Sequence, residues 1–190
     1  WERNTLAAQK KSKKKNWYMS DVNELIEFIS SLDGKGNKNL VSSKVEEKFG
    51  LNKDRSVFFC DSFAIRFCYS SGKYFNGTVV GLSKLKKFDN LPFIVCLIKP
   101  QKNEMYIANS TFITKLSHTS HKLSIDNIKG SFNGSDILKE LGGITNQRDN
   151  ILKLYPFHCD STFEENLSRL VDATGEIIGK KKKILIDDDK

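Results

Sequence analysis

One uninterrupted apolar run, Phe93-Ile-Val-Cys-Leu-Ile98, constrains the fold of this chain more than any other feature. It is short, rich in β-branched and aromatic residues, and bounded by Pro92 and by Lys99-Pro100. Such a run is typical of a strand that is buried on both faces. Six residues cannot cross a bilayer, which requires about 20 apolar residues in a helix. The run therefore predicts a central strand of a covered sheet and excludes a membrane span.

Alternating hydrophobicity predicts further strands around this one. In residues 57–69, Phe63, Ile65 and Phe67 point to one face and Arg66 to the other, which favours a single half-buried antiparallel strand. A second strand is expected at 78–82. The turn residues at 100–103 predict that 105–108 returns as the hairpin partner of 93–98. These patterns predict an antiparallel sheet from 56 to 109.

Helical spacing of apolar residues predicts helices on both sides of this sheet in the chain. They cover 21–32, a short segment with Val41, Val45 and Phe49 that ends at Gly50, and then 136–141, 150–155 and 163–178. The last of these begins with a capping box, Thr162-Phe-Glu-Glu165. Residues 127–134 are expected to form a loop. The fold class is therefore α+β, with a central antiparallel sheet flanked by N-terminal and C-terminal helices.

The length of 190 residues suits one domain with appendages. Residues 1–19 are rich in lysine and are expected to form a basic extension. Residues 20–179 form the single α+β domain. Residues 180–190 contain four lysines followed by three aspartates, and this tail could be a truncated continuation of the chain.

The net charge of +8, from 31 Lys and Arg against 23 Asp and Glu, favours a polyanionic partner. Much of the excess lies in the terminal lysine runs, which weakens this argument. The four cysteines form no C-x-x-C pair, and three lie in apolar runs. They are expected to be reduced in an intracellular, cytoplasmic protein.

A metal-dependent nuclease would need acidic groups and a lysine around Mg²⁺. Asp61, beside a strand, is the best-placed acid and metal ligand, and Lys99, at the end of the buried strand, is the best-placed lysine. The position two residues before Lys99 is Leu97, where an acid would be needed. A complete triad is therefore missing from the sequence. His158-Cys159-Asp160 is not a triad either, because adjacent side chains point apart.

The polar stretch 117–135 offers hydrogen-bond donors suited to DNA. It holds many hydroxyl and amide side chains, two lysines and two glycines. Side chains of this kind bind phosphate oxygens and base edges, and glycine lets the backbone approach a phosphate. An ordinary surface loop with the same composition is the alternative.

Two runs resemble segments of bacterial type II restriction endonucleases and their DNA-recognition domains. They are Asn127-Ile-Lys-Gly-Ser-Phe-Asn-Gly-Ser-Asp136 and Phe163-Glu-Glu-Asn-Leu-Ser-Arg-Leu-Val171. The resemblance implies recognition of a short duplex DNA site, with Mg²⁺-dependent cleavage in this chain or in another domain. The missing acid before Lys99 favours recognition over cleavage.

The leading hypothesis is therefore a double-stranded DNA recognition domain of a bacterial restriction system. The expected DNA contacts are Lys99, Lys102, Asn109, Ser117, His118, Ser120, His121, Lys122, Lys129, Ser131 and Asn133. A Mg²⁺-dependent endonuclease complete in this chain, with Asp61 and Lys99 as catalytic residues, is the first alternative. A protein–protein interaction module, which docks a partner on the apolar face of 163–178, is the second. A homodimer or a fused catalytic domain would be a further partner, and no membrane association is expected.

Overall fold

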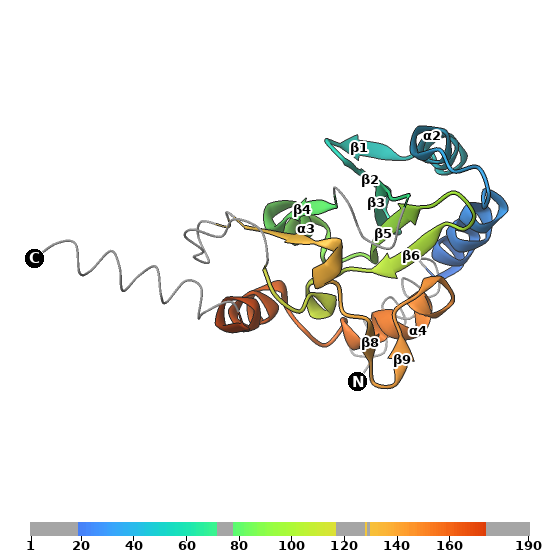
Figure 1. Cartoon of the computed structure of the whole chain (residues 1–190). Helices are drawn as coiled ribbons and strands as arrows, with labels where there is room; N and C mark the ends of the chain where they lie inside the picture. Colours follow the sequence, from blue (N-terminus) through green and yellow to red (C-terminus); the bar gives the residue numbers. More distant parts are fainter. Residues whose placement is uncertain (1–18, 72–77, 117–127, 129, 174–190) are drawn as a thin grey trace, which may run out of the picture.

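A computed structural model describes residues 19–71, 78–116, 128 and 130–173, and its centre is a five-stranded sheet with helices on both sides (Figure 1). The spatial order of the strands is β1-β2-β3-β5-β6. Their bounds are β1 Asn52–Asp54, β2 Val57–Phe59, β3 Ala64–Tyr69, β5 Phe93–Ile98 and β6 Glu104–Ile107. The predicted α+β class and the helices flanking the sheet are confirmed.

The sheet is mixed rather than wholly antiparallel, and this corrects the prediction. β3 and β5 pair in parallel, from Ala64 opposite Phe93 to Tyr69 opposite Ile98, whereas the other three pairs are antiparallel. A parallel pair needs a long crossover. Residues 70–92 provide it, and they contain β4 (Val79–Gly81) and α3 (Leu82–Phe88).

Residues 57–69 form two strands and not the single strand that was predicted. β2 and β3 are joined by a tight turn, in which the Cys60 N–H donates to the Phe63 carbonyl at 3.0 Å. In this turn the Ser62 hydroxyl donates to Asp21 of the N-terminal helix. The polar pair Asp61-Ser62 interrupts the apolar pattern at this turn, and the prediction of one strand passed over this signal.

Two separate cores lie on the two faces of the sheet. One face packs against the helix of residues 19–31, α2 (Lys38–Phe49) and α4 (Ile151–Leu154). The other packs against α3, a small second sheet and the C-terminal helix, which is described over residues 163–173. In β5, Ile94, Cys96 and Ile98 face the first core, and Phe93, Val95 and Leu97 face the second. The prediction of a strand buried on both faces is therefore confirmed.

Two predicted helix ends are also confirmed. α2 ends at Gly50, whose φ of 58° lies in the left-handed region that glycine adopts without a steric penalty. At the start of the C-terminal helix, the Thr162 N–H donates to Glu165 at 2.8 Å, and the Glu165 N–H donates to the Thr162 hydroxyl at 3.2 Å. These hydrogen bonds lower the pKa of Glu165.

The second sheet pairs β4 with β7 (Ser131–Asn133), and it replaces part of the predicted loop 127–134. The predicted strand at 78–82 therefore belongs to this sheet and not to the central one.

The predicted helix 136–141 is also wrong. Only one 3₁₀ turn, η2 (Gly134–Asp136), forms, followed by the hairpin of β8 (Glu140–Leu141) and β9 (Ile144–Thr145). Gly142 and Gly143, with φ of 58° and 76°, favour this hairpin turn over a helix.

The two edges of the central sheet differ. At the β6 edge, Asn146 pairs with the backbone of Ile107: its Oδ1 accepts from the Ile107 N–H, and its Nδ2 donates to the Ile107 carbonyl, both at 2.9 Å. At the other edge, β1 carries the exposed side chains of Asn52 and Lys53. Within the described part of the chain, every helix is too short or too polar to span a membrane.

Candidate nucleic-acid interface

Basic side chains from two distant segments converge at the tip of the β1–β2 hairpin. Lys84 and Lys87, one helical turn apart on α3, both donate to the carboxylate of Asp54 at the end of β1. The Lys87 Nζ–Asp54 Oδ2 distance is 2.7 Å. These two hydrogen bonds, that of Lys84 first, lower the pKa of Asp54 to about 2. Asp54 is therefore ionised at any physiological pH.

The charge at this tip is strongly unbalanced. Residues 52–57 and α3 together contain five basic residues and only one acid, Asp54. Lys86 turns away and pairs with Glu164 at 3.3 Å. Arg66 of β3 approaches from the sheet, where it donates to the Ser56 hydroxyl. We define the hairpin–helix surface as Arg55, Arg66, Lys84 and Lys87 around Asp54. Lys53 lies on the other face of the hairpin, over Phe58 of the first core.

Aromatic rings underlie Lys87 of this surface and Lys53 on the other face of the hairpin. The Lys53 Nζ lies 4.9 Å from the centroid of the Phe58 ring. The Lys87 Nζ lies 5.2 Å from the centroid of Phe88 and 5.6 Å from that of Phe59. A cation over an aromatic face is favourable and limits the freedom of the lysine side chain. The charges are therefore held at defined positions.

The polar stretch 117–129 joins the described chain beside the hairpin–helix surface. The N–H of Leu82, the first residue of α3, donates to the carbonyl of Gly130 at 2.9 Å. Lys84, which bonds Asp54, lies in the same first turn of α3. Figure 1 shows β4, α3 and the tip of the β1–β2 hairpin on the same side of the molecule. Gly130, which follows the polar stretch in the chain, therefore lies at the start of the helix that carries Lys84 and Lys87.

The predicted catalytic pair is not brought together. Asp61 is exposed in the turn before β3, and Lys99 follows the last residue of β5. Because β3 and β5 are parallel and in register, the two residues lie at opposite ends of these strands, about 20 Å apart. Lys99 instead pairs with Glu104 at 2.7 Å. Among the described residues, no group of three or more His, Cys, Asp or Glu side chains could hold a metal ion.

Asn109, a predicted DNA contact, is fully buried and supports the backbone. Its Oδ1 accepts from the Phe93 N–H at 2.9 Å, and its Nδ2 donates to the Leu91 carbonyl at 2.7 Å. It therefore fixes the start of β5 and is closed to DNA, which corrects the prediction.

The other predicted contacts are dispersed. Lys102 is exposed in the β5–β6 turn, on the side of the molecule opposite to β4 and α3 (Figure 1). Ser131 is buried in β7. Asn133 is partly buried, and its N–H donates to Asp136 at 2.8 Å. Ser117, His118, Ser120, His121, Lys122 and Lys129 lie outside the described residues.

A buried polar cluster at the C-terminal end of α3 was not anticipated. The Asp89 carboxylate accepts from the N–H and the hydroxyl of Ser110. His158 contacts the Asp89 carbonyl through Nε2 at 2.6 Å and the Thr111 hydroxyl through Nδ1 at 2.8 Å. Both ring nitrogens are thus engaged, which favours a structural role for His158. Asp89 and His158 are 69 positions apart, so no local motif could have indicated the pair.

The predicted docking face of the C-terminal helix is occupied by its own domain. Phe163, Leu167 and Leu170 belong to the core that α3 and β5 share. Over residues 163–173, this finding contradicts the interaction-module alternative, because the apolar face is buried within the chain.

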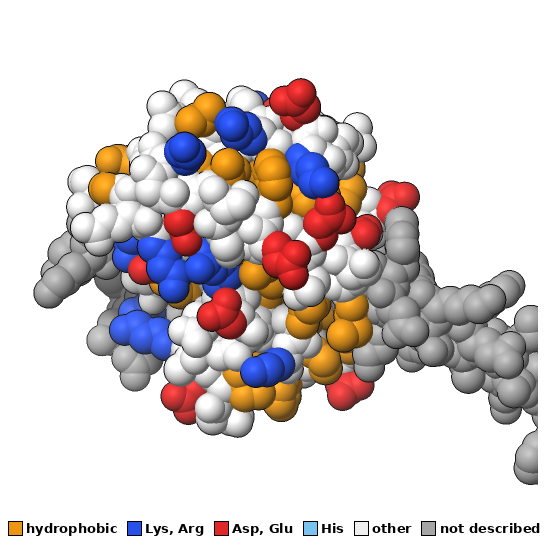
Figure 2. Space-filling view, turned by 90° about the vertical axis from the view of Figure 1, so that its right-hand side faces the viewer, with side chains coloured by type: hydrophobic (Ala, Val, Ile, Leu, Met, Phe, Trp, Pro, Cys, Tyr) orange, Lys and Arg blue, Asp and Glu red, His pale blue; other side chains and the backbone are white. Residues whose placement is uncertain are grey.

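On the side of the molecule with the N-terminal helix and α2, some basic side chains lie next to one another, but acidic and apolar side chains lie among and around them (Figure 2). α2 illustrates the mixture, because Lys48 pairs with Glu24 of the neighbouring helix at 2.8 Å.

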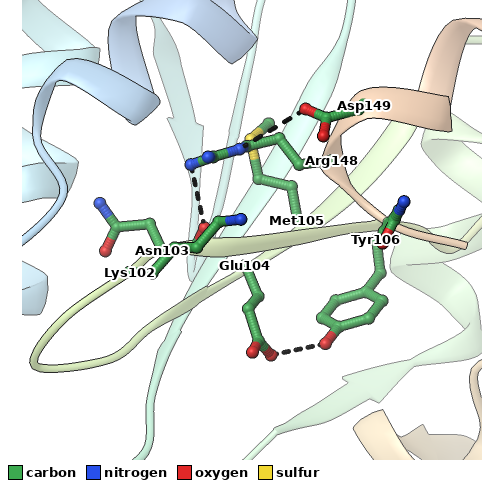
Figure 3. Close-up of a pocket in the computed structure, with 8 residues that line it drawn as sticks. Lys102, Asn103, Glu104, Met105, Tyr106, Arg148 and Asp149 are labelled. Atoms are coloured by element: carbon green, nitrogen blue, oxygen red, sulfur yellow. Dashed lines mark hydrogen bonds and ion pairs between the residues drawn. The ribbon is translucent and has the colours of Figure 1, made fainter.

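A small pocket of about 160 Å³ lies between β6 and residues 147–149 (Figure 3). Arg148 binds Asp33 at 3.0 Å and the carbonyl of Asn103 at 3.3 Å. Burial raises the pKa of Glu104, but hydrogen bonds from Lys99 and Tyr106 outweigh it and leave the pKa lowered. Most charged groups that line this pocket are paired with other charged groups. The pocket is therefore a weaker candidate for binding a polyanion than the hairpin–helix surface.

Comparison of the chain with protein-family models, with curated proteins and with solved structures found no match.

Proposed function

We propose that this chain binds double-stranded DNA, and that the hairpin–helix surface, together with the adjoining polar stretch 117–129, contacts the phosphate backbone. The observation that carries the proposal is that Lys84 and Lys87 bind one carboxylate, Asp54, beside the exposed Arg55 at the hairpin tip. Sequence-independent affinity for DNA comes from lysines and arginines that neutralise phosphates. The resemblance of 127–136 and 163–171 to restriction-type proteins favours duplex DNA over other polyanions.

The position of the polar stretch adds to this proposal. Lys122 and Lys129 belong to a segment that enters the fold at Gly130, which is hydrogen-bonded to the first residue of α3. The hydroxyl and amide side chains of this segment are suited to sugar, phosphate and base contacts. In this proposal the cationic tip attracts the DNA phosphate backbone, and the hydrogen-bond donors of the polar stretch contact sugars and bases.

The test is a titration of fluorescent duplex DNA over a range of salt concentrations. The parent chain should bind with a steep dependence on salt. The double substitution Lys84→Gln with Lys87→Gln should weaken binding to all duplexes and lower the slope of log K against log salt by about 2. The matched control is Lys38→Gln with Lys44→Gln, because both lysines are exposed on α2 at the opposite face of the sheet.

The control should bind like the parent, although its net charge changes equally. If both double variants lower the slope equally, the attraction is diffuse and the hairpin–helix surface is not the binding site. If the parent shows no salt-dependent binding to a duplex, the proposed function is wrong.

A second pair of substitutions tests the polar stretch. Lys122→Gln with Lys129→Gln should also weaken duplex binding and lower the salt slope. An unchanged slope would remove the polar stretch from the binding surface and leave the hairpin and α3 alone.

A further inference from the structure

Arg55 occupies an unusual position at the tip of the β1–β2 hairpin. Asp54 opposite Val57 closes the hairpin, so that Arg55 and Ser56 form a two-residue loop. The φ of Arg55 is 57°, and no other non-glycine residue in the described part of the chain has a positive φ. Glycine is the usual residue where only the first loop position has a positive φ. A large charged residue at this position is therefore explained better by function than by stability.

The side chain of Arg55 is exposed and available. Its neighbours are already engaged: Asp54 binds Lys84 and Lys87, and the Ser56 hydroxyl accepts from Arg66. No hydrogen bond or ion pair joins Arg55 to another described residue. Among the described residues, the planar guanidinium of Arg55 therefore has no partner and is exposed.

The dimensions of the hairpin suit a DNA groove. β1 is the edge strand of the sheet, and β2 pairs with β3 on its other side, so the part of the hairpin that extends beyond the β1–β2 and β2–β3 pairs is the loop of Arg55 and Ser56. Both loop residues are exposed. The major groove of B-DNA is about 12 Å wide and admits a loop of this size with its side chains. Lys84 and Lys87 lie behind the tip, where they would face the phosphates beside the groove.

We infer that the β1–β2 hairpin enters the major groove and that Arg55 reads a guanine, through paired hydrogen bonds to O6 and N7. This inference rests on the proposed binding to duplex DNA and adds the element that recognises sequence. Arginine at a guanine edge is the commonest specific contact in the major groove, and lysine cannot reproduce its fork. Arg55 is thus a specificity-determining residue, whereas Lys84 and Lys87 provide affinity.

The test uses a pool of duplex oligonucleotides with a randomised centre, selected separately by the parent, Arg55→Lys and the control Lys44→Gln. The parent and the control should enrich the same motif, which contains a fixed guanine. Arg55→Lys should reduce the preference for that guanine by about tenfold and leave the salt slope unchanged, because the charge is kept.

A second variant, Arg55→Asn, guards against a folding artefact. Asparagine tolerates a positive φ, so this variant should be at least as stable to heat as the parent. It should also lose the preference for the guanine.

The outcomes separate the two proposals. If Arg55→Lys and Arg55→Asn both keep the parental guanine preference, the inference is wrong. It is also wrong if the parent binds duplexes with a steep salt slope but enriches no motif, and in that case the proposed function stands. If the parent binds no duplex, the proposed function fails and the inference fails with it.

Discussion

Asp54 of β1 lies beside α3, bound by Lys84 and Lys87, whereas Asp89 follows the last residue of that helix, and their surroundings differ. Asp89 is 5 % exposed, and its carboxylate is bound by neutral donors of Ser110 and Asn109. Asp54 is bound by two lysines whose side chains are 26 % and 53 % exposed, and further cations surround it. Asp89 accepts hydrogen bonds that fix buried groups, whereas Asp54 binds two of the several cations at the surface. The comparison teaches that partner chemistry and burial, rather than residue type, separate a structural acid from one at a binding surface.

Removal of Asp89 should have the largest effect on the free energy of unfolding. Asp89→Ala should lower the free energy of unfolding by about 4 kcal/mol, because it leaves several buried donors without an acceptor. Urea denaturation followed by circular dichroism measures this change. Asp149→Ala is the matched control, since the Asp149 side chain is 72 % exposed, and it should have almost no effect. A loss below about 1 kcal/mol in Asp89→Ala would contradict the structural role of the buried cluster.

The lysines around Asp54 should matter much less for stability. Lys84→Gln with Lys87→Gln should lower the free energy of unfolding by much less than Asp89→Ala, because ion pairs at the surface are screened by solvent and contribute little. The same urea experiment applies. A loss as large as that of Asp89→Ala would show that the hairpin–helix surface holds the fold together, which would contradict the contrast drawn above.

Arg55→Asn should have a smaller effect of the opposite sign. A left-handed backbone conformation costs L-residues other than glycine and asparagine about 1–2 kcal/mol. Partial relief should raise the free energy of unfolding by about 0.5 kcal/mol. Differential scanning calorimetry should show a slightly higher Tm, and a lower Tm would indicate that Arg55 stabilises the hairpin.

The smallest effect on stability should come from Asp54, and it should be visible only in how the free energy of unfolding depends on pH. Because the pKa of Asp54 is lowered from 3.8 to about 2, its pairing with the lysines stabilises the folded state above about pH 4. This contribution should be lost as the pH falls from about 4 to 2, where the carboxylate becomes protonated. The stability difference between the parent and Asp54→Asn should therefore narrow over this range. A difference that stays constant with pH would mean that the charge of Asp54 does not contribute.

Local signals in the sequence predicted the local structure well. The apolar run 93–98, the stop at Gly50 and the capping box at Thr162 each depend on neighbouring residues, and all three are confirmed. The reversal at 60–63 was missed although Asp61-Ser62 interrupts the apolar alternation, because a break of two polar residues is a weak signal between two apolar runs. The helix expected at 136–141 was wrong because two glycines follow it and form a hairpin turn instead.

Long-range contacts explain the remaining errors. Whether β3 and β5 run parallel depends on the path of the crossover at 70–92, which no local pattern specifies. Asn109 resembled a surface residue because asparagine is usually exposed, and its burial depends on carbonyl groups at 89 and 91. The hairpin–helix surface was missed for the same reason, because its two parts are about 30 residues apart.

The side chain of Asn146 has a consequence for assembly. By satisfying both backbone groups of Ile107, it mimics one residue of a neighbouring strand and terminates the hydrogen-bond ladder at the β6 edge. A second molecule cannot extend the sheet there without displacing this amide. At the β1 edge, lysine and arginine repel an identical copy. Both edges of the central sheet are thereby protected against strand-to-strand aggregation, one by a side-chain amide and the other by charge.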